Sequence, residues 1–480
     1  MTRLLILIST YLVTGSCQQQ VLNESEVSKK PNIILIMSDD QGWGDVGYQG
    51  HPHLQTPHLD SMAANGLVFD RFYAAAPVCS PTRGSVLTGR HPFRYGIFYA
   101  NVGHLPAEEI TLPEILEEKG YATGHFGKWH LGMMDKNVIE SNRGGFARNL
   151  PHYSPPWENG YQVTFATESK VPTWDPVINP DTAVAGANKN QNPGDSYGSY
   201  YWTGPGCIAT ENLQGDDSRV IMDRVLPFIN QSAQSGKPFF ASIWFHTPHS
   251  PVIAGEEYRE MYSEFSENQQ HYFGCITAMD EQIGRLRAQL RQLGIAENTM
   301  IWFCSDNGPA AQGGGPGLLA GERQQGSTGG LRGRKGTLYE GGIRVPGILE
   351  WPAVIQKART TNVPAVTSDY LPTILDFLGI ATDNLPALDG NSLKSVIMVK
   401  QEFRKRGIGF QSKFRGKMYQ VWNQDQYKLI RIAEDNDFEL YDIQVDPTEA
   451  KNLFESMPEV AEQMKKELSI WIEETERDLE

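Results

Sequence analysis

Ile33-Ile34-Leu35-Ile36-Met37-Ser38-Asp39-Asp40 is an unbroken apolar run that ends abruptly in a serine and two carboxylates. A short apolar run without polar alternation is typical of a strand buried on both faces of a parallel sheet. Residues 239–245 and 300–304 have the same form. Helical patterns lie between these runs, and the alternation of strands with helices predicts a doubly wound α/β domain.

Polar side chains follow each of these runs, at the point where the strand would end. The second run leads into His246-Thr247-Pro248-His249 and the third into Ser305-Asp306-Asn307-Gly308. Each segment alone is consistent with an ordinary turn, because Asp, Asn and Gly are common turn residues. Binding sites in open α/β sheets form at the carboxyl ends of strands, so three such ends indicate a hard-cation site built from oxygen ligands. His249 is then a candidate proton donor, and the candidate ligands are Asp39, Asp40, Asp306 and Asn307.

Positive charge gathers in two glycine-bounded segments, although the chain is acidic overall. These are Gly127-Lys128-Trp129-His130-Leu131-Gly132 and Leu331-Arg332-Gly333-Arg334-Lys335-Gly336. Solvated surface is the simpler interpretation, and it suits the two arginines. A lysine and a histidine between glycines at a strand end are better explained by close approach to an anion. A cation, lysines and histidines together suit an anionic, oxygen-rich group such as sulfate or phosphate.

The charge balance argues against a nucleic-acid partner. The 480 residues include 42 Lys and Arg and 57 Asp and Glu, which gives a net charge of −15. Such a surface repels a phosphate backbone. The length allows one large domain and a smaller one.

The first 17 residues have the form of a secretory signal peptide. Arg3 precedes an apolar stretch over residues 4–13, and small residues lead to Cys17. The stretch is too short to span a bilayer, and no other segment is apolar enough, so we expect an exported chain without a transmembrane segment. The expected location of the protein is the periplasm or the extracellular space, or the lysosome if the source is a eukaryote. Lipoprotein anchoring at Cys17 is disfavoured by Thr14 three places before it.

The other four cysteines are too sparse for a disulfide scaffold. Cys304 is expected to be a buried thiol, and Cys207 with Cys275 is a candidate bridge, although sequence cannot set their distance. Residues 141–215 show neither helical nor strand periodicity and are expected to form long loops.

The chain changes character after about residue 385. Short strand-like pieces occur at residues 407–410, 418–422, 427–432 and 438–441, and a helix is expected from Pro458. We therefore expect a catalytic α/β domain over residues 28–385 and, over residues 386–480, a subdomain with an antiparallel sheet and a terminal helix.

Cys79-Ser80-Pro81-Thr82-Arg83, followed by Leu87-Thr88-Gly89-Arg90, is the most specific motif in the chain. Taken alone, it places a cysteine at the amino end of a helix, where a thiolate or a bound anion is favoured, or where a buried cysteine simply caps the helix. The motif resembles that of the type I sulfatases. In that family a separate enzyme oxidises the cysteine to formylglycine, an aldehyde that hydrates to a geminal diol. The resemblance covers about residues 30–455, without departure at a motif position.

The resemblance implies the fold of the alkaline phosphatase superfamily, which is a large mixed, mostly parallel sheet flanked by helices, with a small carboxy-terminal antiparallel sheet. It also implies one calcium ion per chain. Its ligands would be Asp39, Asp40, Asp306, Asn307 and an oxygen of modified Cys79. Arg83 is similar to the arginine that braces the formylglycine hydrate. The residues that match those around the sulfate are Lys128, His130, His249 and Lys335.

The implied reaction is hydrolysis of a sulfate ester by a sulfuric ester hydrolase. One diol oxygen attacks sulfur while the metal and lysines stabilise the sulfate oxygens. His249, helped by Lys335, protonates the departing alcohol, and His130 accepts a proton from the second hydroxyl as sulfate is expelled.

The expected substrate is a sulfated carbohydrate, such as a fragment of a glycosaminoglycan or an algal-type polysaccharide. The expected maturation partner is a formylglycine-generating enzyme or an anaerobic sulfatase-maturating enzyme. Two alternatives stay open: a phosphonate or phosphate monoester hydrolase that uses the same formylglycine, and an inactive carbohydrate-binding relative. Intact Cys79, Lys128, His130, His249 and Lys335 argue against the inactive relative.

Overall fold

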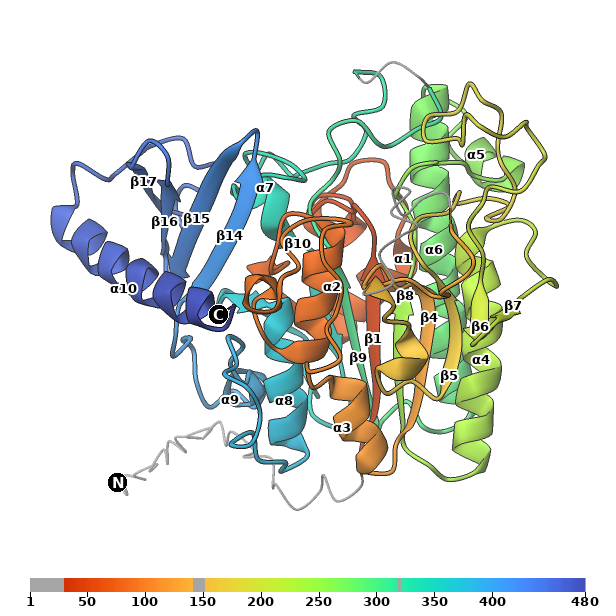
Figure 1. Ribbon diagram of the computed structural model, residues 1–480, viewed down its shortest axis with the longest axis horizontal. Helices are drawn as coiled ribbons and strands as arrows, with labels where there is room; N and C mark the ends of the chain where they lie inside the picture. The colour runs from red at the N-terminus through yellow and green to blue at the C-terminus, as the bar shows by residue number, and fades with distance from the viewer. Residues whose placement is uncertain (1–29, 141–151, 318–320, 480) are drawn as a thin grey trace, which may run out of the picture.

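The protein is built around a ten-stranded sheet. The computed structural model describes residues 30–140, 152–317 and 321–479. The expected signal peptide at residues 1–17 lies outside these ranges. Five central strands run parallel and adjacent (Figure 1). In spatial order they are β9 (Thr299–Ser305), β1 (Asn32–Ser38), β8 (Phe239–Trp244), β4 (Ala122–Lys128) and β5 (Val163–Thr167). The three apolar runs of the sequence therefore form the middle of this sheet, as predicted.

Antiparallel pairings at both sides make the sheet mixed. Beyond β9 lie β11 (Gly347–Glu350), β2 (Leu67–Phe69) and β12 (Arg359–Thr361), with β11 antiparallel to both β9 and β2. Beyond β5 lie the antiparallel strands β6 (Trp202–Gly204) and β7 (Cys207–Ile208). The long loops expected over residues 141–215 are therefore interrupted by three strands that the sequence did not reveal. Strands β5, β6 and β7 are two to five residues long, too short to show a periodic pattern.

Helices cover both faces of the sheet (Figure 1). On β1, Ile33, Leu35 and Met37 face one core and Ile34 and Ile36 face the other, because successive side chains of a strand point to opposite sides. The first core is covered by α2 (Cys79–Thr88), α3 (Leu112–Glu118) and α8 (Tyr370–Phe377). The second is covered by α1 (Pro57–Asn65), α4 (Asp217–Gln234) and α6 (Glu267–Gln292).

Shorter elements complete this part of the chain. The helices are α5 (Glu256–Glu260), α7 (Glu340–Ile343) and α9 (Lys394–Ile397), with 3-10 turns at Gly47–Gln49, Pro92–Tyr95, Pro156–Glu158 and Thr367–Asp369. A small second sheet contains β10 (Arg344–Val345), β3 (Phe72–Tyr73) and β13 (Ala365–Val366).

A four-stranded antiparallel sheet near the carboxyl end carries the last helix on one face. The strands are β14 (Ile408–Phe414), β15 (Lys417–Gln424), β16 (Tyr427–Ile432) and β17 (Asp437–Asp442), and the helix is α10 (Pro458–Arg477). Trp471 and Leu468 of α10 pack against Trp422 and Leu429. The predicted mostly parallel sheet and the separate antiparallel sheet are both confirmed, and the boundary near residue 385 stays a prediction.

Cys207 and Cys275 do not form the disulfide that was a candidate from the sequence. Cys207 is exposed on β7, whereas Cys275 is buried inside α6, and both are free, so the candidate bridge is wrong. Cys304 is buried on β9, as predicted. No helix of the described ranges is long and apolar enough to cross a bilayer.

Candidate active site

The carboxyl ends of the central strands lie level with one another. Ser38 at the end of β1 is paired with Ser305 at the end of β9, and Met37 is paired with Trp244 of β8. Trp244 is in turn paired with Gly127 of β4. The polar residues that follow β9, β1, β8 and β4 therefore emerge at one edge of the sheet, where the sequence predicted a site.

Three carboxylates meet at this edge. Oxygens of Asp39, Asp40 and Asp306 all lie within 4.8 Å of one another, and the three side chains are buried. Asp40 has a positive φ of 65°, an uncommon conformation for a residue with a Cβ, and its backbone N–H donates to Asp306 Oδ1 at 3.1 Å. Burial, and next the charge of Asp39, raise the pKa of Asp306 to about 7. Positive charge placed beside the three carboxylates relieves the repulsion between them.

Two buried oxygens at the cluster are available as metal ligands. Asp39 Oδ1 and Asn307 Oδ1 have no hydrogen-bond partner within the described part of the chain. The Asn307 amide donates to Asp40 Oδ1 at 2.7 Å and to the Gly308 carbonyl at 2.9 Å, which fixes the direction of its oxygen. Buried polar atoms without partners are rare. Carboxylate and amide oxygens are the donors that calcium prefers, so the residues present fit this ion.

Each carboxylate also contacts its own basic side chain. Lys128 Nζ donates to Asp39 Oδ2 at 2.5 Å, and Lys335 Nζ donates to Asp40 Oδ1 at 2.5 Å. Burial opposes ionisation of Asp39, but neighbouring cations, led by Lys128, hold its pKa well below the usual value. The pairing holds both ammonium groups at the same edge of the sheet.

Arg83 lies beneath this cluster and is fully buried. Its guanidinium donates to Asp306 Oδ2 at 2.6 Å and to the Lys128 carbonyl at 3.1 Å, and it lies 5.3 Å from the centre of the Trp244 ring. A planar guanidinium can hold several acceptors at once. Arg83 therefore ties helix α2 to the ends of β4 and β9.

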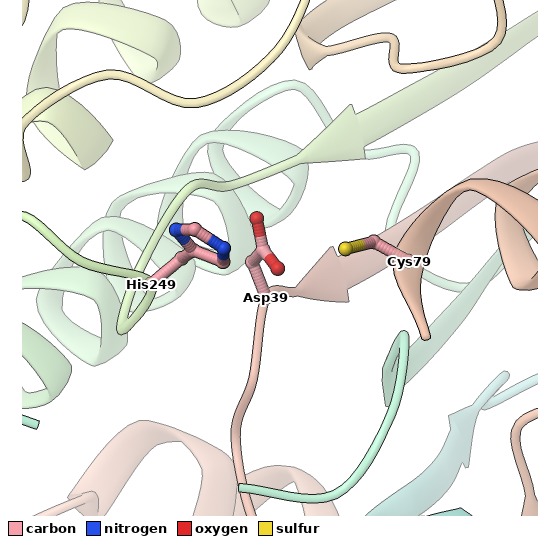
Figure 2. Close-up of side chains that lie close together, drawn as sticks. All are labelled: Asp39, Cys79 and His249. Carbon is pink, nitrogen blue, oxygen red and sulfur yellow. The ribbon is translucent and has the colours of Figure 1, made fainter. Parts of the chain in front are cut away.

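Cys79 is the first residue of α2 and projects toward the carboxylates. Its Sγ, a carboxylate oxygen of Asp39 and a ring nitrogen of His249 all lie within 4.8 Å of one another (Figure 2). Burial raises the pKa of the Cys79 thiol, although Lys128 and Lys335 oppose this. An unmodified Cys79 is therefore held as the neutral thiol, which is a poor nucleophile.

His249 and His130 flank the cluster. His249 Nδ1 donates to the Ser250 carbonyl at 2.8 Å, which leaves Nε2 directed at Asp40 Oδ2 across 3.8 Å. Burial lowers the pKa of His249 to about 3. His130 has a φ of 60°, and its Nε2 donates to Asn101 Oδ1 at 2.7 Å. Two such conformations beside one cluster, at His130 and Asp40, are typical of functional sites.

The structure brings the predicted catalytic and metal-ligand residues together at this edge, whereas the ring of His246, which follows β8, makes its hydrogen bonds to other residues. His246 is buried, and its ring bonds Asp217 Oδ2 at 2.8 Å and Thr167 Oγ1 at 2.7 Å. It therefore has a packing role. His130 joins the helix of Cys79 through Asn101, whose backbone N–H donates to Ser80 Oγ at 3.4 Å.

Two residues near the site were missed from the sequence. Asn101 lies in an irregular loop, where no periodicity marks it. Lys170 follows the short strand β5, in the sequence Thr167-Glu168-Ser169-Lys170. The rule that polar residues follow buried strands could have found Lys170 if the strand itself had been recognised.

Known proteins resemble this chain over most of its length. The sulfatase family matches residues 31–380, and a family described as "N-sulphoglucosamine sulphohydrolase, C-terminal" matches residues 334–474. The N-acetylgalactosamine-6-sulfatase of the dog, Canis lupus familiaris, is 30% identical over 85% of this chain and 73% of its own length. Human arylsulfatase A is 32% identical over 78% of this chain and 68% of its own.

A solved structure has the same fold. The crystal structure of Ps i-CgsB in complex with k-i-k-neocarrahexaose superimposes with a TM-score of 0.77 and covers 92% of this chain and 93% of that chain, at 23% identity. The family match and the identity to the dog enzyme each extend over more than two thirds of the chain. The resemblance read from the Cys79 motif is thereby confirmed: the chain belongs to the sulfatase family of the alkaline phosphatase superfamily and is a sulfuric ester hydrolase.

Proposed function

We propose that this sulfatase cleaves sulfate esters of carbohydrates at the Cys79 cluster, with formylglycine at position 79 and one calcium ion beside it. The observation that carries the proposal is the meeting of Cys79 Sγ with Asp39 and His249 within 4.8 Å. A nucleophile position, a metal-ligand carboxylate and a proton carrier are thereby close enough to act on one sulfate group.

The proposed calcium ligands are oxygens of four side chains and of modified residue 79. Bound there, calcium supplies positive charge that polarises the S–O bonds of the substrate. The hydrated aldehyde supplies a hydroxyl nucleophile that the buried thiol does not provide. The four side chains are Asp39, Asp40, Asp306 and Asn307.

Lys128 and Lys335 are proposed to bind the sulfate oxygens. Both ammonium groups are held at the cluster by carboxylates, and side chains anchored in this way need little rearrangement when the substrate enters. Arg83 is proposed to brace the modified residue, since it lies one turn along α2 from Cys79 and is fixed by Asp306.

His249 is proposed to protonate the leaving alcohol. Its Nδ1–H is engaged by the Ser250 carbonyl, so the proton that moves is carried on Nε2. Burial lowers the pKa of His249, but an incoming sulfate monoester brings a negative charge that favours the imidazolium. His130 is proposed as the base, because the Nε2 bond to Asn101 fixes the tautomer in which Nδ1 accepts a proton.

A sulfated carbohydrate is the proposed substrate because the names or bound ligands of similar proteins refer to sugars. The dog protein is named an N-acetylgalactosamine-6-sulfatase, and the similar structure of Ps i-CgsB holds neocarrahexaose. We further propose export by the signal at residues 1–17 and maturation by a formylglycine-generating or anaerobic sulfatase-maturating enzyme.

The test is to co-express the chain with a maturating enzyme and assay it on matched aryl sulfate and aryl phosphate, and on defined sulfated saccharides. We expect the sulfate to be preferred, formylglycine in the Cys79 peptide by mass spectrometry, and about one calcium per chain by elemental analysis. Cys79→Ala is the matched control and should be inactive yet folded. Full activity of protein with an unmodified thiol would refute the proposed nucleophile. Preference for aryl phosphate would indicate a phosphate or phosphonate monoester hydrolase instead.

A further inference from the structure

Lys170 lies on the segment that joins the two histidine-bearing loops of the site. The His130 backbone N–H donates to the Glu168 carbonyl at 2.9 Å, two residues before Lys170. Three residues after Lys170, the Thr173 N–H donates to the Pro251 carbonyl at 3.1 Å, and Pro251 is two residues from His249. The backbone of Lys170 is therefore fixed between these two loops, at the carboxyl end of β5.

The Lys170 side chain is half-buried and has no carboxylate partner in the described part of the chain. Glu168, the acidic residue nearest in sequence, accepts a hydrogen bond from the Met134 N–H at 3.2 Å. Burial, and then the charges of Lys128 and Lys335, lower the pKa of Lys170 to about 8, while Asp39 opposes this. The ammonium group thus lies within electrostatic range of the site and is charged at neutral pH.

The charges of the site are already matched without Lys170. Lys128 pairs with Asp39, Lys335 with Asp40 and Arg83 with Asp306. Lys170 is thus an additional cation, and no further carboxylate of the described ranges pairs with it. A half-buried charge without a partner is unfavourable in the free protein, and a bound anion relieves that cost. A calcium ion would increase the excess of positive charge further.

We propose that Lys170 binds a second anionic group of the substrate, so that the preferred substrate is a saccharide with another sulfate, or a carboxylate, near the sulfate ester that is cleaved. This inference rests on the proposed carbohydrate substrate. The reacting sulfate is bound by Lys128 and Lys335, whereas Lys170, on the neighbouring loop, contacts a group that does not react. Lys170 is therefore a specificity-determining residue.

The experiment compares Lys170→Met with wild type on three matched disaccharides. One carries a single sulfate, one carries two sulfates, and one carries a sulfate and a uronate carboxylate. A hydrogen-bonded charge pair at a partly buried site is worth about 10–100-fold in affinity. We expect Lys170→Met to lower kcat/KM by that factor for one or both doubly charged substrates and to leave the singly charged one nearly unchanged. The affected substrate identifies the second anionic group.

Two further variants separate charge from structure. Lys170→Arg keeps the charge and should retain most of the preference. Lys237→Met removes the same charge from an exposed position just before β8, at the opposite edge of the sheet, and should change nothing. The preference of the wild type should also decrease with added salt, because a partly exposed charge pair is screened.

Equal losses on all three substrates in Lys170→Met, or a wild type without preference for the doubly charged disaccharides, would overturn the inference. Activity on aryl sulfate without hydrolysis of any saccharide would count against the proposed substrate class instead. In that case the affinities of the disaccharides for Cys79→Ala and for Cys79→Ala with Lys170→Met, measured by calorimetry, still decide the inference. An affinity for doubly charged sugars that does not depend on Lys170 would refute it.

Discussion

Replacing Arg83 with methionine should weaken both the fold and the reaction. The guanidinium is fully buried, lies 2.6 Å from Asp306 and 3.6 Å from Asp39, and donates to the Lys128 carbonyl. Methionine has a similar length but carries neither charge nor donors. Arg83→Met therefore leaves two buried carboxylates with less compensation and the carbonyl without this donor.

The size of the effect follows from the burial. Removing one partner of a buried ion pair typically destabilises a protein by about 3–5 kcal/mol. A chain of 480 residues unfolds with an entropy of about 1 kcal/mol/K, since each residue contributes about 2.1 cal/mol/K. The expected decrease in Tm is therefore about 3–5 °C for the metal-free protein. The loss of kcat/KM should be larger than this shift suggests, because α2 then no longer holds residue 79 in place.

The assay is thermal unfolding in a chelator, at a fixed scan rate, together with kcat/KM on an aryl sulfate. Arg287→Met is the matched control, since Arg287 makes a buried two-bond pair with Glu350, at 2.8 Å for each bond, outside the site. We expect similar decreases in Tm for both variants, and a loss of kcat/KM for Arg83→Met alone. An unchanged Tm in Arg83→Met would refute the assigned charge pairing, and equal activity losses in the two variants would refute its specific role.

Three further results are expected. Lys128→Ala and Lys335→Ala should each lower kcat/KM for every sulfate ester, by the equivalent of about 2–4 kcal/mol. An unchanged kcat/KM would show that the lysine does not bind the reacting sulfate. His249→Ala should lower kcat/KM about 10²–10⁴-fold on a sulfated sugar but far less on nitrophenyl sulfate, because the nitrophenolate leaving group needs no proton. Equal losses on the two substrates, with the chemical step rate-limiting, would indicate that Lys335 is the general acid instead. Asn101→Asp should raise the pKa of His130 and move the limb of the pH–rate profile that reports this base upward by about one unit; no shift would show that the 2.7 Å contact does not tune His130.

The central sheet and much of the site could be predicted because their signals are local. An apolar run such as residues 33–37 indicates a buried strand without reference to the rest of the chain, and the polar residues after it emerge at the sheet edge. Parallel pairing then brings Asp39, Asp306 and Lys128 together in register. The antiparallel sheet could be predicted for the same reason, since its four strands alternate with short charged turns.

Asn101 and Lys170 could not be identified because their proposed roles depend on distant partners. Asn101 acts through His130, a residue on another loop, and the loop of Asn101 has no pattern of its own. Lys170 is placed by backbone bonds to the His130 segment and to the Pro251 segment. The strand before Lys170 has only five residues, and the long irregular segment after it hides that signal.

The arrangement at the sheet edge is better explained by the reaction than by stability. Buried ion pairs such as Lys128–Asp39 and Arg83–Asp306 seldom stabilise a fold more than apolar side chains of similar volume, because desolvation offsets the attraction. The left-handed conformations of Asp40 and His130 add a further cost of about 1–3 kcal/mol each. The strands that carry these residues have fully buried apolar neighbours on both faces, and this packing offsets the cost. The stability of the sheet therefore permits a dense, fixed set of charges at its carboxyl edge, and that preorganised field is what a sulfate ester requires for hydrolysis.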